Sequence, residues 1–225
     1  MKHYFDIDSV LIYLSIFIGS LIFVGVAEYY LYKKDGTIYK GQRRLIGIIF
    51  LSIAILIPCL FASFRGLKVG LDINTYIINN FQFGQRSGIS FSYFQDNMPI
   101  PTEFLFTLLI FICCKIGDIH LLFFLIEVLI IVPLAIVMVK KRGKGSLVLE
   151  FALFYFLFFN FTLSGMRQSI AMSFLTVALF EILDGRKKKA LLLTIIAQLF
   201  HASVILIVIL ILICFFINNS KRKRM

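Results

Sequence analysis

The feature that most constrains this chain is the distribution of its charged residues. Long apolar blocks contain almost none of them, and the basic residues gather in short connectors between the blocks. With a mean hydropathy of +0.95 and a hydrophobic share of 60%, a soluble globule of 225 residues would lack a polar surface. The sequence therefore predicts a protein that lies in a lipid bilayer.

The apolar blocks number about seven. Crossing a hydrocarbon core of ~30 Å takes roughly 20 helical residues, so most blocks can span it alone. Backbone groups cannot bond water in lipid, and solid apolar runs differ from the short alternating strands of a barrel, so each block is expected to be helical. The predicted fold is an all-α, polytopic integral membrane protein with a single transmembrane domain over residues 1–225. The blocks are Ser9–Tyr32, Leu45–Phe64, Thr102–Ile116, Ile119–Val139, Leu147–Leu163, Met166–Leu183 and Ala190–Ile217.

The net charge of +11 does not indicate a nucleic-acid partner, because the basic residues sit in connectors where the positive-inside rule explains them. These connectors are expected to face the cytoplasm. They contain Lys33, Lys34, Lys40, Arg43 and Arg44; Lys140, Lys141, Arg142 and Lys144; Arg186 to Lys189; and Lys221 to Arg224.

A simple alternation of spans does not satisfy this rule everywhere. The first two blocks place residues 65–101 outside as an external loop, too polar to cross lipid, and two further spans would leave Lys140–Lys144 outside as well. The short block Thr102–Ile116, which follows Pro99 and Pro101, resolves the conflict if it is re-entrant. The last block is too long for one straight span and ends in a basic tail, which leaves open a break near His201 or a second error in the alternation of spans.

Cysteines and the N-terminus give weaker signals. The four cysteines (Cys59, Cys113, Cys114 and Cys214) lie inside apolar blocks without metal-ligand spacing, so they are expected to be packing residues, and no metal is predicted. A full-length span follows Asp8 at once, which predicts that the first helix is retained rather than cleaved as a signal peptide.

Polar residues that remain at membrane depth or at its edge are the candidate functional residues, because each is costly without a partner. Four groups qualify and are expected to converge on one external cavity of positive sign, set by Arg65, Lys68 and Arg167. They are Arg65 with Asp72, Thr75 and Tyr76; Pro101 with Glu103; Ser164, Gly165, Arg167, Gln168 and Ser169; and Gln198, His201 and Ser203.

Each candidate has a plainer explanation. Arg65 and Arg167 can snorkel to lipid headgroups, and His201 can be an interhelical hydrogen-bond donor. Asp72 suits a turn, and Glu103 suits a helix N-terminus. The isolated charged residues, among them Glu28, Glu127 and Glu150, have no partner of matching type in the sequence and are assigned no role.

Three stretches resemble the EpsG family, within the broader group of Wzy-type polysaccharide polymerases. They are FRGLKVGLDINTYIINNF, PTEFLF and SGMRQSIAMSFLTVALFEILDGRKKKALLLTIIAQLFHASVILIVIL. The family shows an Arg and a V-G-T-D-T-x-x-Y-like loop, an R-Q-x-(I/L)-A helix start and an F-H-x-S motif. Here Leu71 and Asn74 depart from that loop. Family members are commonly longer, so the resemblance implies a short or truncated chain.

The resemblance implies a polymerase at the external face of a bacterial cytoplasmic membrane. Its substrate would be an oligosaccharide repeat unit on a polyprenyl diphosphate, its partners membrane lipids and other polysaccharide-assembly proteins, and it would need no cofactor. Arg167 and Arg65 would bind the diphosphate. His201 would be the general base or a donor to the diphosphate, and Asp72 would be the alternative base or would bind sugar hydroxyls. Tyr76, Gln168 and Glu103 would contact substrate. The alternative is a non-catalytic scaffold or a lipid-linked-glycan transporter component.

Overall fold

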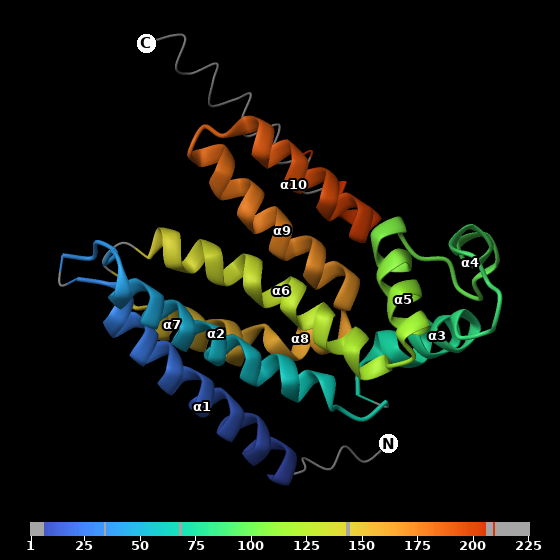
Figure 1. Cartoon of the computed structure of the whole chain (residues 1–225), viewed down its shortest axis with the longest axis horizontal. Coiled ribbons are helices and arrows are strands. Elements are labelled where there is room, and N and C mark those ends of the chain that lie inside the picture. Colours follow the sequence, from blue (N-terminus) through green and yellow to red (C-terminus); the bar gives the residue numbers. More distant parts are fainter. Residues whose placement is uncertain (1–6, 34, 68, 143–144, 206–208, 210–225) are drawn as a thin grey trace. The chain divides into compact units, whose positions relative to one another are not determined.

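The computed structural model describes residues 7–33, 35–67, 69–142, 145–205 and 209. In this part of the chain all regular structure is helical, and an isolated bridge joins Tyr32 to Ile38 (Figure 1). This confirms the predicted helical class. The chain separates into two compact units, one formed by Met1–Val69 and Phe123–Leu163, the other by Gly70–Leu122 and Ser164–Met225.

Within the described residues, four helices are long and apolar enough to cross a bilayer: α1 (Ile7–Leu31), α2 (Gln42–Ser63), α6 (Ile119–Lys141) and α9 (Met166–Leu183). They match four of the predicted blocks, α9 residue for residue. The predicted total of about seven spans is not confirmed, because the other blocks form shorter helices. These are α5 (Phe104–Ile116), α7 (Leu147–Leu157) with α8 (Phe159–Ser164), and α10 (Lys187–Phe200).

Two of the shorter helices come from interrupted blocks. The predicted block Leu147–Leu163 breaks at Phe158, and the predicted block Ala190–Ile217 breaks at His201, where α10 ends and a 3-10 turn, η2 (Ala202–Val204), follows. The rest of the last block, with Cys214 and the basic tail, lies outside the described residues apart from Ile205 and Ile209.

The first unit packs α1, α2, most of α6 and α7–α8 together. Ser20 on α1 donates to the carbonyl of Ala54 on α2 at 2.7 Å and lies 2.8 Å from the hydroxyl of Tyr155 on α7. Phe17 stacks on Tyr155, with 5.1 Å between the ring centroids. Small residues permit this close approach, since a Cβ at Gly47 would lie 2.6 Å from a Leu31 side-chain carbon.

The two ends of the first unit differ in chemistry. At one end Tyr32, after α1, donates to the carbonyl of Val139 near the end of α6, and Arg142 pairs with Glu28. Tyr32 and Arg142, at the edges of two basic connectors, therefore lie at this end. At the opposite end Arg65, just past α2, contacts Phe123 and Glu127 in the first half of α6.

The segment between Arg65 and Phe123 begins and ends at the same end of the first unit, because these two residues are in contact. Its longest helix, α5, has 13 residues and spans only about 20 Å at 1.5 Å per residue. The interpretation of Thr102–Ile116 as a re-entrant segment stays a prediction.

Residues 65–101, predicted as an external loop, are largely helical. They contain a π-helix, η1 (Ile73–Ile77), and the short helices α3 (Ile78–Gly84) and α4 (Phe91–Asn97). Buried Asn80 holds the segment by donating to the carbonyl of Ile100 and accepting from its N–H. α3 packs tightly on α5, since a Cβ at Gly84 would lie 2.8 Å from Sγ of Cys114.

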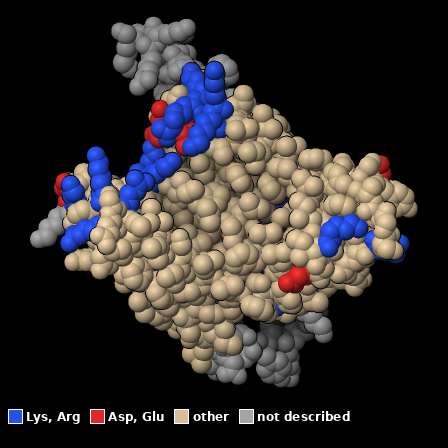
Figure 2. Space-filling model, viewed as in Figure 1, with Lys and Arg blue, Asp and Glu red and all other residues tan. Residues whose placement is uncertain are grey.

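The second unit also contains the antiparallel pair α9 and α10, which lie side by side (Figure 1). Their turn holds the basic residues 186–189, where Arg186 and Lys189 pair with Glu181. At the opposite end of the pair lie the start of α9 and the end of α10. Most of the visible surface carries no charged residue, and Lys and Arg stand out in small groups (Figure 2).

Candidate functional site

The carboxylate of Glu103 is the centre of a polar cluster in the second unit. Arg167 donates through Nη1 to Oε2 of Glu103 at 2.8 Å, and Nδ1 of His201 lies 3.1 Å from Oε1. The backbone N–H of Ala202 donates to the same Oε1 at 2.9 Å. One carboxylate thus joins the starts of α5 and α9 to the end of α10.

Arg167 is held from a second side by η1. Its guanidinium lies over the ring of Tyr76, with 4.3 Å between the guanidinium carbon and the ring centroid. Tyr76 is buried, and its hydroxyl makes no hydrogen bond of normal geometry within the described residues. A planar cation stacked on an aromatic face is restricted in orientation, so the edges of the guanidinium are presented in a defined direction.

Asp72 acts on the backbone next to Arg167. Its Oδ2 accepts a hydrogen bond of 2.9 Å from the N–H of Met166, the first residue of α9. Gly165, the N-cap residue of α9, has no side chain for this purpose, and Asp72 supplies the missing acceptor from another segment. Asp72 is the residue immediately before the π-helix, a distortion that often occurs at functional sites.

His201 lies where α10 stops. Its backbone is extended (φ −158°, ψ 116°), so the chain leaves the helix and the N–H of Ala202 turns toward Glu103. Gln198, one turn earlier, donates to the carbonyl of Ala202 at 3.0 Å and closes the break. The predicted break near His201 is therefore confirmed, and it brings His201 within reach of α5 and α9.

The electrostatic environment favours an ionised Glu103. Burial acts to raise the pKa of this carboxyl, but the N–H of Ala202 and the Arg167 guanidinium outweigh burial and hold the pKa below its ordinary value. Burial, together with the neighbouring Asp72, raises the pKa of the Tyr76 hydroxyl, which stays protonated.

The described cluster is not positive, contrary to the predicted cavity. It contains the carboxylates of Asp72 and Glu103 and one guanidinium, with an imidazole beside them. Of the other two residues expected to supply positive charge, Arg65 belongs to the first unit, and Lys68 lies outside the described residues. The expectation of a positive cavity rested on the basic residues and left out the charges of Asp72 and Glu103.

Arg65 takes part in a separate, buried cluster. Its side chain is 2% exposed, and Nη1 lies 3.6 Å from Oε1 of Glu127, whose side chain is fully buried. The hydroxyl of Thr162 on α8 lies 3.2 and 3.1 Å from the two carboxylate oxygens of Glu127, and Phe123 lies under the guanidinium at 4.6 Å. The prediction that Arg65 binds substrate stays a prediction.

Glu127 and Glu28 were assigned no role from the sequence, and both prove to have cationic partners, Arg65 and Arg142. A signal was available: an acid inside an apolar helix needs a partner, and a basic residue near a predicted helix end is the natural candidate. The sequence did not reveal which one, because the partners are far apart along the chain.

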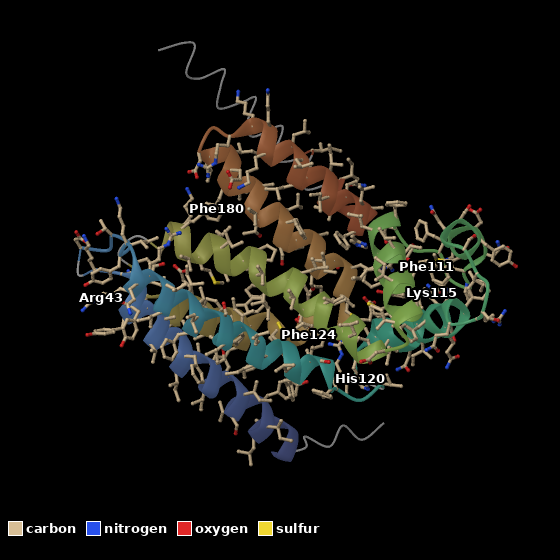
Figure 3. All side chains as sticks on the ribbon, in the orientation of Figure 1. Arg43, Phe111, Lys115, His120, Phe124 and Phe180 are labelled. Atoms are coloured by element: carbon tan, nitrogen blue, oxygen red, sulfur yellow. The ribbon has the colours of Figure 1, made fainter. Side chains whose placement is uncertain are left out.

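The remaining predicted residues lie outside the hydrogen-bonded cluster. Gln168 is exposed on α9, and Ser203 belongs to η2. Lys115, which the sequence did not single out, lies at the end of α5, over the ring of Phe111, and donates to the carbonyl of Arg86 (Figure 3). Within the described ranges, no group of three or more His, Cys, Asp or Glu is arranged to hold a metal ion.

Comparison with known proteins places the chain in a family. No match was found among curated proteins or among solved structures. The model of the EpsG family matches residues 48–225, from within α2 through the stretches that contain Asp72, Glu103, Arg167 and His201. The match covers well over half of the chain, and the chain therefore belongs to the EpsG family.

Proposed function

We propose that this protein polymerises oligosaccharide repeat units carried on a polyprenyl diphosphate, at the external face of a bacterial cytoplasmic membrane. Membership of the EpsG family and the long apolar helices support a membrane protein of exopolysaccharide biosynthesis. The observation that carries the catalytic part is the single carboxylate of Glu103, which holds Arg167 and His201 side by side.

The reaction requires two kinds of group. Negative charge develops on the diphosphate as it leaves, and an acceptor hydroxyl must lose its proton. Arginine suits the first task, because its planar fork donates two parallel hydrogen bonds to phosphate oxygens and remains charged. An imidazole suits the second, because its ordinary pKa near 6.5 lets it accept and release a proton near neutral pH.

The proposed step is a glycosyl transfer. The acceptor oxygen forms a bond to the anomeric carbon of the growing glycan, and the bond from that carbon to the diphosphate oxygen breaks, with its electron pair leaving on the diphosphate. The hydroxyl proton passes to His201. Arg167 binds the diphosphate and stabilises the charge that develops there. No redox change occurs, so this step needs no electron carrier.

The other residues have supporting parts in this proposal. Asp72 caps α9 beside Arg167 and is the alternative base, and Tyr76 keeps the guanidinium oriented. Gln168, exposed one residue after Arg167, is available to sugar hydroxyls. Arg65 acts on the diphosphate only if its buried pair with Glu127 opens, which makes it the weakest of the proposed substrate contacts.

The test is complementation of a bacterium that makes the lipid-linked repeat unit but lacks its exopolysaccharide polymerase. The parent chain is compared with Arg167→Lys, Arg167→Ala and His201→Ala, and the size of the lipid-linked glycan is examined on a gel. Arg86→Lys is the matched control, because Arg86 is an exposed arginine of the same unit that lies over Phe83. Membrane insertion is checked for every variant.

Long polymer from the parent and the control, with single repeat units from the three site variants, would support the proposal. Arg167→Lys is the sharpest variant, because it keeps the charge and loses the fork. Single units from the correctly inserted parent would refute a self-sufficient polymerase and favour a transporter component or scaffold. Long polymer from all site variants would refute the roles of Arg167 and His201.

A further inference from the structure

The two ring nitrogens of His201 are not equivalent in this structure. Nδ1 lies 3.1 Å from Oε1 of Glu103. Nε2 has no hydrogen bond within the described residues, and about one fifth of the side chain is exposed (21%). In a neutral imidazole one nitrogen carries a hydrogen and the other can accept a proton from a substrate. The hydrogen-bond partner of each nitrogen decides which of them carries the hydrogen.

Glu103 can only accept at this position. Its carboxylate already receives hydrogen bonds from Nη1 of Arg167 and from the N–H of Ala202, and both donors favour the ionised form. An ionised carboxylate has no hydrogen to donate. The contact of 3.1 Å is therefore a hydrogen bond only when Nδ1 carries the proton, which leaves the lone pair of neutral His201 on Nε2.

We infer that Glu103 is a positioning residue: it holds His201 in the tautomer protonated on Nδ1, so that Nε2 is the atom that takes the proton of the acceptor hydroxyl. The role assigned to Nε2 rests on the proposed function, and the tautomer does not. Glu103 was predicted to bind substrate, and its contacts point instead to an indirect role through His201 and Arg167.

The same carboxylate oxygen also fixes the ring in place. Oε1 accepts from Nδ1 of His201 and from the N–H of the next residue, Ala202. These two contacts fix the main chain and the imidazole relative to one acceptor, and the second oxygen is anchored by Arg167. Rotation of the imidazole about its side-chain bonds would break the contact between Nδ1 and Oε1, while the hydrogen bonds from Ala202 and Arg167 keep Glu103 in place. The observed orientation of the ring is therefore favoured.

The test is ¹⁵N NMR of the full chain in lipid bilayers, with all histidines labelled. The chain has three histidines, His3, His120 and His201, and the His201 signals are identified by their loss in His201→Gln. Spectra are recorded at about pH 8.5, where an imidazole of ordinary pKa is neutral. The chemical shifts of the two nitrogens report which one carries the hydrogen.

The parent is expected to show His201 protonated on Nδ1, opposite to the tautomer that a free histidine side chain prefers in water. Glu103→Gln can donate as well as accept, and Glu103→Asp is one methylene shorter, so both are expected to raise the population protonated on Nε2. Asp96→Asn removes an exposed carboxylate on α4 and is expected to leave the tautomer unchanged. The His120 signals show whether each variant keeps its fold.

A parent spectrum with His201 protonated on Nε2 would overturn the inference, as would an unchanged tautomer in Glu103→Gln. The complementing strain adds the functional arm: Glu103→Gln is expected to lower polymer formation by roughly 10²–10⁴-fold, the usual contribution of a positioned general base. If the tautomer depends on Glu103 but the parent makes no polymer, the proposed polymerase function is refuted, while the role of Glu103 in setting the tautomer of His201 is supported.

Discussion

Glu127→Gln is expected to destabilise the first unit strongly. The substitution keeps the size of the side chain and an amide that can still bond Thr162, and it removes the charge opposite Arg65. The Arg65 side chain is 2% exposed and that of Glu127 is fully buried, so neither water nor salt can replace the lost partner. The variant therefore removes from a buried cation the negative charge that Glu127 supplies.

The magnitude follows from this burial. Removing one partner of a buried ion pair costs about 3–5 kcal/mol in general. The distance of 3.6 Å between Nη1 and Oε1 is longer than a hydrogen bond, and the contact of Arg65 with Phe123 remains in the variant. Both facts favour the lower end of the range, so the free energy of unfolding is expected to fall by about 3 kcal/mol.

The assay is unfolding of the purified chain in mixed micelles by increasing SDS, followed by loss of helical circular dichroism. The double variant Arg65→Met, Glu127→Leu removes both charges and is expected to recover most of the loss, because replacing a whole buried pair is often neutral. Asp35→Asn, an exposed carboxylate in the first connector, is the control and is expected to change little. A Glu127→Gln variant as stable as the parent would refute the reasoning.

Three further predictions concern the second unit and the topology. Tyr76→Phe keeps the ring under Arg167 and is expected to leave polymer length unchanged in the complementing strain. Tyr76→Leu removes a cation–π contact of about 0.5–2 kcal/mol and is expected to shorten the polymer. Equal polymer lengths in the two variants would contradict the role of the ring. Asp72→Ala removes the acceptor for the N–H of Met166 and is expected to destabilise the chain by about 1 kcal/mol in the SDS assay, with a smaller loss for Asp72→Asn. Asn97→Cys and Asp118→Cys place thiols at exposed positions before and after α5, and both are expected to react with a membrane-impermeant maleimide added to the same side of the membrane. Thr37→Cys is expected to react only from the other side. If Asp118→Cys were labelled from the same side as Thr37→Cys, α5 would cross the membrane.

The long helices could be predicted from sequence because their cause is local. A solid apolar run such as Met166–Leu183 must satisfy its backbone internally in lipid, and the polar residues at its ends mark where that requirement stops. The break at Phe158 carries no comparable signal, since neither proline nor glycine stands there. The helices within residues 65–101 were missed because polar composition was taken to indicate loop, while buried Asn80 and the packing of Gly84 stabilise them through distant contacts.

The sequence predicts that the polar groups containing Arg167, His201 and Glu103 converge, but it does not predict which residues contact one another. Their contacts join positions 64 and 98 residues apart. The central position of Glu103 depends on how α5, α9 and α10 pack, which no local pattern encodes. The same holds for Asp72, whose partner is a backbone N–H 94 residues away.

The charge balance of the cluster bears on how it could act on a diphosphate. Two carboxylates and one guanidinium are not in themselves an attractive site for an anion, and a permanent second cation would suit binding better than it would suit release. In the proposed reaction the general base becomes a cation only as it accepts the proton. As the acceptor hydroxyl gives its proton to His201, the imidazole becomes positive while the leaving diphosphate becomes more negative, and Glu103 stabilises the imidazolium through Nδ1. In the proposed reaction the cluster therefore favours the transition state over the bound substrate, which is the condition for faster chemistry rather than tighter binding.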